Sequence, residues 1–249
     1  MKLEQDWHIH TFRSKCGKPD NTVPSIVAKL DEAGMRLAGL ADHINLPGER
    51  DWFTRVVAEN RADLDALEPQ CKVLVGAEAT MLSPFLCALD ADLAPSLDFV
   101  LIACNHYHLE AVENPPRRTP RAYADHYLDM LEGAIGLGFA DAIAHPFLHT
   151  KLDAATAADT LRCYNETRLS GILHAAAQAG VAFEINPRQV CQAVEWHRDL
   201  VIEARRHGAR FTLGSDSHTL SGIGYGPMGS GHLPSALCDT IGLTNADLK

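Results

Sequence analysis

Long apolar runs are missing from this sequence. No stretch approaches the ~18 consecutive apolar residues that a membrane-spanning helix needs, so no such helix is expected. Residues 1–6, Met-Lys-Leu-Glu-Gln-Asp, also lack the apolar segment of a secretory signal peptide. No Cys-x-x-Cys pair is present, and the 7 cysteines are an odd number in a chain of 249 residues. A disulfide framework is therefore not expected, and a reducing, cytoplasmic location is the simpler interpretation.

Positive charge is scarce as well. Lys and Arg number 22 against 32 Asp and Glu, which gives a formal net charge of -10. Such an acidic chain matches neither a long nucleic acid nor an anionic membrane, both of which are bound through clustered positive charge. The 46% hydrophobic and 22% charged residues are ordinary for a globular protein. No linker, repeat or low-complexity segment divides the chain, so a single domain over residues 1–249 is expected.

What the sequence does contain is an alternation of short apolar runs and longer helical patterns. The runs predict strands near residues 6–11, 37–41, 73–77, 99–103, 142–144, 181–183 and 211–214. Helices are expected between them, including one long helix that ends near Gly180, and residues 83–95 favour a mixture of helix and loop. Strands that alternate with helices pair in parallel, and uninterrupted apolar runs indicate strands covered on both faces. Seven such units predict an α/β fold, a distorted (β/α)7 TIM-like barrel with its chemistry at the C-terminal ends of the strands.

The 13 histidines are a compositional surplus, and two of them lie in the first expected strand. Residues i and i+2 of a strand point to the same side, so His8 and His10 aim two imidazoles, which are common metal ligands, at one place. Eight ligand-type residues exceed what one catalytic metal needs, and a mixture of His, Glu and Asp suits Zn, Mn or Fe. The sequence thus predicts a cluster of two or three divalent metal ions, which suits phosphate ester hydrolysis. Besides those two histidines, the ligand-type residues at the ends of apolar runs are His43, Glu78, His106, His145, Asp216 and His218.

These motifs, taken together and in this order, resemble those of the polymerase and histidinol phosphatase (PHP) superfamily. The resemblance covers nearly the whole chain. It implies a distorted seven-stranded (β/α) barrel with a trinuclear metal centre that hydrolyses a small phosphorylated metabolite with a water activated by the metals. Histidinol phosphate, a nucleotide and a sugar phosphate stay open as substrates. The matching stretches are Asp6-Trp7-His8-Ile9-His10-Thr11, Ala41-Asp42-His43, Gly76-Ala77-Glu78, His106, Ala144-His145-Pro146, Phe183-Glu184-Ile185-Asn186 and Gly214-Ser215-Asp216-Ser217-His218.

The resemblance also implies how the ligands are shared between the first two metals. Glu78 bridges them. The other ligands of the first metal are His8, His10 and Asp216, and those of the second metal are His106 and His145.

The third metal is where this chain departs from the family pattern. His43 and His218 would hold it together with a ligand from the loop after the first strand, where many family members have His or Asp. This chain has Cys16 in that loop, with Asp20 and the poorer ligand Lys18 nearby. Three outcomes stay open: the third metal is bound through the cysteine, bound weakly, or absent.

Several neighbouring residues have two interpretations each. His106 is preferred to His108 as the ligand because it follows its apolar run directly, which leaves His108 nearer the substrate. Asp42 is expected to support a ligand histidine through a hydrogen bond rather than to bind metal, and Glu184 is a candidate for similar support. Arg188 either grips a substrate phosphate or is a solvated loop residue.

Two other functions stay open. Metal-dependent amidohydrolase or lactonase barrels also begin with His-x-His, but they usually place a bridging Lys at the end of a middle strand, and this sequence has none there. A non-catalytic metal-binding barrel is the second alternative, although only the position of Cys16 departs from the expected ligand set. A serine hydrolase is not expected, because no Gly-x-Ser-x-Gly motif surrounds Ser217. The oligomeric state is not predicted.

Overall fold

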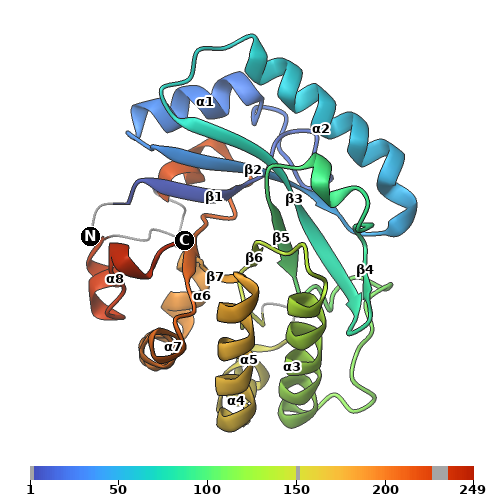
Figure 1. The fold of residues 1–249 in the computed structure, drawn as a ribbon, viewed down its shortest axis with the longest axis vertical. Coiled ribbons are helices and arrows are strands. Elements are labelled where there is room, and N and C mark those ends of the chain that lie inside the picture. Colours follow the sequence, from blue (N-terminus) through green and yellow to red (C-terminus); the bar gives the residue numbers. More distant parts are fainter. Residues whose placement is uncertain (1–2, 150–151, 226–234) are drawn as a thin grey trace.

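A curved parallel sheet forms the centre of the molecule, and helices cover its outer side (Figure 1). The computed structural model describes residues 3–149, 152–225 and 235–249, with the backbone alone described at 154–155, 187–188 and 235–236. Seven strands run parallel in the order β1-β2-β3-β5-β6-β7-β8, and the short β4 pairs antiparallel with β3. The strands are β1 Gln5–Ile9, β2 Leu37–Ile44, β3 Lys72–Ser83, β4 Leu86–Cys87, β5 Val100–Ala103, β6 Ala142–Ile143, β7 Ala182–Ile185 and β8 Phe211–Leu213.

Helices form most connections between the parallel strands. The first begins where the Thr22 side chain accepts a hydrogen bond from Ser25 N, and Thr119 caps the third in the same way. α1 and α2 lie beside β1–β3, whereas α3, α5 and α7 lie beside the later strands (Figure 1). In the described part of the chain, no helix has both the length and the apolar character needed to cross a membrane. The α-helices are α1 Val23–Glu32, α2 Arg50–Asp65, α3 Pro120–Gly136, α4 Ala154–Cys163, α5 Glu166–Ala179, α6 Pro187–Gln192, α7 Val194–His207 and α8 Ser235–Thr240.

The sheet closes on itself where the segment after β8 meets β1. His10 N donates to Ser217 O at 2.9 Å, and Ser217 N donates to His8 O at 3.2 Å. The buried Asp6 carboxylate reinforces this seam, because it accepts hydrogen bonds from Ser215 N at 2.9 Å and from Gly224 N at 3.2 Å. The sheet is thereby a nearly closed barrel, and the predicted TIM-like α/β fold is confirmed.

Three local features differ from the expectation. β2 and β3 are longer than predicted, so His43 and Glu78 lie within these strands and face each other in register. Residues 83–95, expected to mix helix and loop, include the short strand β4, and a 3-10 turn begins at their end, over Ala94–Ser96. The expected long helix is divided into α4 and α5, because the Asn165 side chain caps α5 by accepting a hydrogen bond from Arg168 N at 2.9 Å.

An aromatic pair and several small residues fill the barrel below its mouth. The rings of Trp7 and Phe99 meet edge to face with centroids 5.5 Å apart. Gly39 and Gly76 are required here, because a Cβ at either position would lie 2.5 Å from the Phe99 ring. Glu78 lies two residues after Gly76 on the same face of β3. The polar layer of the barrel therefore begins directly above this aromatic layer.

One buried histidine on α7 is held in its neutral form. His197 is 1% exposed, and its Nδ1 donates to Ala193 O at 2.7 Å. Burial lowers the pKa of His197 to about 4. Since the ordinary histidine pKa is about 6.5, the unfolded chain binds more protons than the folded chain between these two values.

We expect His197 to destabilise the folded protein as the pH falls from about 6.5 towards 4. In metal-free protein, lowering the pH from 7 to 5 costs about 2 kcal/mol of unfolding free energy through this group. The variant His197→Asn keeps a donor for Ala193 O and cannot titrate. Its unfolding free energy, measured by urea unfolding, should therefore fall by about 2 kcal/mol less than that of the wild type between pH 7 and pH 5. The exposed His174 on α5 provides the control variant, His174→Asn. Equal pH dependence in wild type and His197→Asn would contradict the assignment.

Candidate metal centre

Five imidazoles surround the fully buried carboxylate of Glu78 at the mouth of the barrel. They come from different parts of the sheet: two from β1 and its end, one from β2, one from the segment after β5 and one from the segment after β6. Glu78 Oε2 lies 3.2 Å from His8 Nε2, 3.5 Å from His10 Nε2 and 2.8 Å from His43 Nδ1, and Oε1 lies 3.4 Å from His106 Nε2 and 2.7 Å from His145 Nε2.

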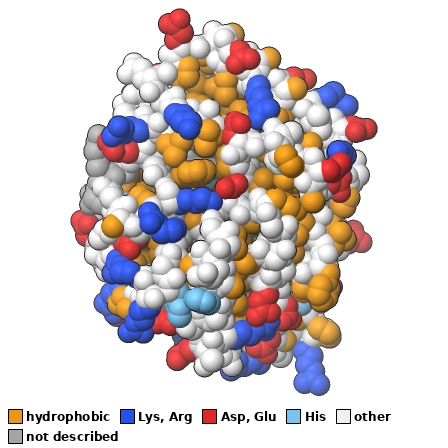
Figure 2. Space-filling model, in the orientation of Figure 1, with side chains coloured by type: hydrophobic (Ala, Val, Ile, Leu, Met, Phe, Trp, Pro, Cys, Tyr) orange, Lys and Arg blue, Asp and Glu red, His pale blue; other side chains and the backbone are white. Residues whose placement is uncertain are grey.

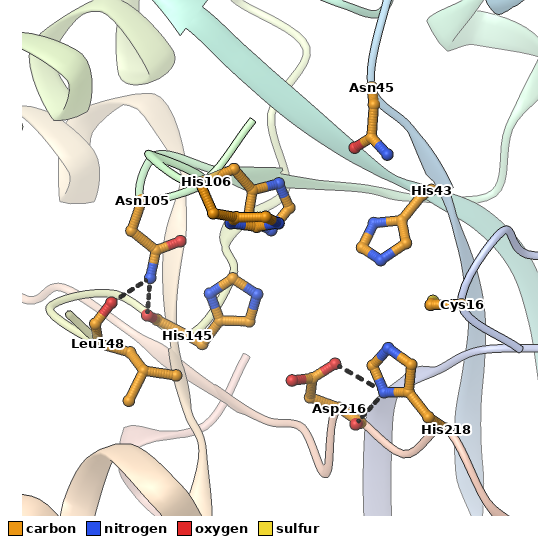
Figure 3. A pocket seen from close by; sticks show the side chains of 10 residues that line it. Cys16, His43, Asn45, Asn105, His106, His145, Leu148, Asp216 and His218 are labelled. Carbon is orange, nitrogen blue, oxygen red and sulfur yellow. Dashed lines mark hydrogen bonds and ion pairs between the residues drawn. The ribbon is translucent and has the colours of Figure 1, made fainter. Parts of the chain in front are cut away.

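A second carboxylate approaches this group from the other side of the barrel seam. Asp216 Oδ1 lies 3.2 Å from His10 Nε2 and 3.5 Å from His218 Nδ1. The His218 Nδ1 also donates to the backbone oxygen of Asp216 at 2.9 Å (Figure 3). The structure thus brings all eight ligand-type residues of the sequence analysis to one place, as the barrel prediction required.

Hydrogen bonds behind the rings fix which nitrogen faces the centre. Glu184 Oε2 accepts from His8 Nδ1 at 2.9 Å, so His8 Nε2 points at Glu78. The hydroxyl of Thr80 donates to Asn45 Oδ1 at 2.8 Å, and its oxygen lies 2.8 Å from His106 Nδ1. Because that hydroxyl proton is already used, His106 Nδ1 donates to Thr80 and leaves the lone pair of Nε2 facing the centre.

Several buried polar atoms at the centre have no hydrogen-bond partner among the described residues. They include His8 Nε2, His43 Nδ1 and Glu78 Oε2. His43 Nδ1 lies 2.8 Å from Glu78 Oε2 but is not aligned with it as a hydrogen bond. Buried polar atoms are nearly always paired, and these converging nitrogen and carboxylate lone pairs are the ligands that divalent cations take. The residues present therefore fit a metal cluster.

The pKa shifts at the centre indicate that the Glu78 carboxylate requires positive charge beside it. Burial opposes the charged form of Glu78, but the imidazoles of His43 and His8 hold the pKa of this carboxyl well below its usual range. Burial likewise favours neutral His43, yet the Glu78 carboxylate raises the pKa of His43 to about 10. A bound cation would take over the role of these protonated rings.

The loop after β1 brings Cys16 to the rim of the centre. The ligand atoms of Cys16, His10, His43 and His218 all lie within 4.8 Å of one another. Burial favours the thiol form, but hydrogen bonds from His218 and His43 outweigh it and lower the pKa of Cys16 to about 6. The two alternative loop residues, Lys18 and Asp20, are exposed. Metal binding by the cysteine stays a prediction.

His106 and His108 occupy different places. His106 is 7% exposed and lies within the group around Glu78, whereas His108 is exposed. The His108 ring centroid lies 5.3 Å from that of His106, and both rings line the same cavity. The geometry thus favours His106 as the ligand and places His108 where a substrate would enter.

Asp42 has a different role from the one expected. One of its oxygens accepts from Thr11 N at 2.7 Å, and the other accepts from the Thr11 hydroxyl at 2.7 Å and from Asn60 Nδ2 at 2.8 Å. The prediction that Asp42 supports a ligand histidine is wrong, because these groups from the loop after β1 and from α2 take up its oxygens. Glu184 and Thr80 provide that support, and sequence reasoning missed Thr80 entirely. The side chain of Arg188 lies outside the described residues, so its contact with a phosphate stays a prediction.

Two of the ligand-type residues have strained backbone. His145 has φ 30° and Asp216 has φ 53°, and residues other than glycine rarely adopt this left-handed region of backbone conformation. Such conformations cost about 1–3 kcal/mol each and persist where the surroundings fix them. Asn105 provides part of that restraint, since its side-chain amide donates to His145 O at 3.1 Å and to Leu148 O at 2.7 Å (Figure 3).

A cavity of about 380 Å³ opens above the centre (Figure 3). Its lining contains imidazoles, amides, one thiol and one carboxylate, with no Lys or Arg among the described residues. A small anion in this cavity would depend on bound cations for its neutralisation. The lining residues are Cys16, His43, Asn45, Asn105, His106, His108, His145, Leu148, Asp216 and His218.

We expect Glu184→Gln to weaken metal binding without unfolding the protein. Glu184 Oε2 accepts from both His8 Nδ1 and His145 N, each at 2.9 Å, so neutralising it loosens the orientation of two ligand-type residues. Loss of such support typically lowers metal affinity about 10–100-fold. Competition against a chelating indicator measures the change, and Glu32→Gln, at an exposed carboxylate on α1, is the matched control. Equal affinity in wild type and Glu184→Gln would exclude this role.

Comparisons with known proteins give a result at the level of structure. Neither the models of protein families nor the curated protein sequences give a match. Among solved structures, the histidinol phosphate phosphatase HisK of Lactococcus lactis subsp. lactis Il1403, complexed with zinc, L-histidinol and phosphate, is similar with a TM-score of 0.61 and 18% identity over 97% of this chain and 95% of that chain. A Listeria monocytogenes protein named HisK for an inferred histidinol phosphatase activity has a TM-score of 0.62 and 13% identity over 90% of this chain and 98% of its own. This chain thus shares the fold of these two proteins.

Proposed function

We propose that this protein is a metal-dependent phosphoesterase that acts on a small phosphorylated metabolite. The observation that carries the proposal is the convergence of five imidazoles and Asp216 around the buried Glu78 carboxylate, beneath an open cavity at the C-terminal mouth of the barrel. This is the end of a barrel at which catalytic residues gather. The full-length likeness to a phosphatase complexed with zinc and phosphate supports the same activity.

The ligand set accommodates two or three divalent ions of Zn, Mn or Fe. Such ions, when bound, lower the pKa of a water ligand, polarise a phosphoryl group and neutralise its leaving oxygen. Glu78 would bridge the first two, and its two oxygens face different histidines. His8, His10 and Asp216 would hold the first ion, and His106 and His145 would hold the second. A third ion would be held by His43, His218 and Cys16.

The cavity indicates a compact substrate. Its described lining has no Lys or Arg, so the phosphoryl group would face the imidazoles and their ions, and the leaving alcohol would lie beside Asn45, Asn105 and Leu148. Acidic and basic side chains are mixed over the face shown in Figure 2, where they form no continuous basic band for a long nucleic acid. Histidinol phosphate is the first candidate, because the similar Lactococcus lactis protein is complexed with L-histidinol and phosphate. Nucleotides and sugar phosphates are the next candidates.

Phosphate release tests the proposal directly. Protein loaded with Zn, Mn or Fe is offered histidinol phosphate, nucleoside monophosphates, cyclic and bisphosphorylated nucleotides, and sugar phosphates. We expect release from at least one of them, and we expect His145→Ala to abolish it because this ring lies 2.7 Å from Glu78. His174→Ala, at an exposed histidine of α5, is the control and keeps wild-type activity.

The same experiment can overturn the proposal. If metal-loaded protein releases no more phosphate than His145→Ala from any substrate, the protein is not a phosphoesterase of these classes. Hydrolysis of amides or lactones would then identify the amidohydrolase alternative, and a lack of all turnover would favour a non-catalytic metal-binding barrel.

His106 and His108 provide a test of where metal and substrate lie. His106→Ala removes a ligand at the buried centre, so we expect metal content and activity to fall together. His108→Ala alters the exposed rim, so we expect unchanged metal content and a KM raised about 5–10-fold, which corresponds to one lost hydrogen bond. Elemental analysis and steady-state kinetics on both variants give the two readouts. If His108→Ala loses metal and His106→Ala does not, His108 is the metal ligand and His106 is not.

A further inference from the structure

The rim of the centre, formed by Cys16, His43 and His218, differs chemically from the buried interior around Glu78. Around Glu78 the available atoms are carboxylate oxygens and imidazole nitrogens, whereas the rim adds a thiol. Cys16 Sγ belongs to a group with His10, His43 and His218 whose ligand atoms all lie within 4.8 Å of one another. Figure 3 shows Cys16 between the rings of His43 and His218, at the side of the cavity.

The loop after β1 holds this thiol in place. Ser14 N donates to Thr11 O at 3.1 Å and Gly17 N donates to Ser14 O at 2.9 Å, so two successive tight turns present Cys16. The Ser14 hydroxyl lies 3.4 Å from Cys16 Sγ and accepts from His43 N at 3.4 Å. Gly17 is required, since a Cβ there would lie 2.0 Å from Thr11 O. The sulfur is thus positioned by backbone contacts.

The loop is in turn fixed to the barrel. Asp42 accepts from both the backbone and the side chain of Thr11, and Asn21 Nδ2 donates to His10 O at 2.7 Å. Phe12 N donates to Asn21 O at 2.9 Å, which closes the base of the loop. The buried Asp42 side chain therefore orders the loop that carries the Cys16 thiol.

We propose that Cys16, with His43 and His218 and within reach of His10, forms a thiolate site that selects zinc over manganese or magnesium, next to a carboxylate-bridged pair of sites that lacks this selectivity. The inference rests on the proposed function only in requiring that the cluster hold metal ions. Thiolate and imidazole ligands in tetrahedral sets favour zinc, whereas manganese and magnesium prefer oxygen ligands. The cluster is then chemically asymmetric, with zinc at the rim.

Cobalt substitution tests this site without using turnover. Cobalt(II) bound by a thiolate shows a near-ultraviolet charge-transfer band that nitrogen and oxygen ligands do not give. We expect the band when full-length apoprotein is titrated with cobalt(II), its loss in Cys16→Ser, and its displacement by zinc. All 7 cysteines lie in the described part of the chain and are free thiols, so Cys191→Ser, at an exposed cysteine, is the matched control and keeps the band.

Metal content gives a second readout. After dialysis, wild type should retain about one more equivalent of zinc than of manganese, and Cys16→Ser should lose that additional zinc. Cys16→Asp supplies an oxygen ligand, so it should bind manganese at this position and show no charge-transfer band. Cys16→Asp keeps the test interpretable if Cys16→Ser fails to fold. Circular dichroism on both apoproteins checks that each variant is folded.

The outcomes separate this inference from the proposed function. A cobalt-loaded wild type without the band, or a band that persists in Cys16→Ser, overturns the thiolate site even if phosphate is released. Equal retention of zinc and manganese by wild type overturns the selectivity. A cysteine-dependent band in a protein that hydrolyses no phosphate ester supports the site and refutes the phosphoesterase proposal alone.

Discussion

A carboxylate with no exposed surface is tolerated in a folded protein only when neighbouring groups replace its lost hydration. Glu78 is such a carboxylate, and the imidazoles that surround it come from four different parts of the sheet. These rings depend in turn on partners behind them, such as Glu184 for His8 and Thr80 for His106. The arrangement of side chains at the mouth of the barrel therefore depends on Glu78, on the histidines around it and on the strands that carry them.

Depth within the barrel divides the centre into two environments. The interior around Glu78 is shielded from water, so charge there is compensated by fixed neighbours. At the rim, the side chain of His218 is 26% exposed, and Cys16 is partly exposed beside it. A molecule that enters the cavity would meet His218, Cys16 and His108 first, and the buried Glu78 carboxylate lies below. The site thus combines a buried group of ligand-type residues with a more accessible rim.

The barrel and the grouping of ligand-type residues were predictable because parallel strands end at the same edge of a sheet, whatever their sequence separation. Partners within the site were not, since they depend on register and side-chain rotamers that no local pattern encodes. His8 and Glu184 lie 176 positions apart, and only the fold brings them together. Asp42 was misassigned because proximity in sequence to His43 suggested a contact, whereas its side chain points to Thr11 on the neighbouring loop.

The seam of the barrel joins the first strand to the segment after the last strand. Between β1 and the described part of the segment after β8, the backbone contributes one isolated bridge, from Ile9 to Ser217. His10 and Asp216, on opposite sides of this seam, are 206 positions apart. An ion held by both would tie nearly the entire polypeptide into a ring, and such a cross-link restricts the unfolded chain more strongly as the enclosed loop grows. With an ion bound, His10 and Asp216 would therefore also stabilise the closed barrel, and β1 would separate less readily from the segment after β8.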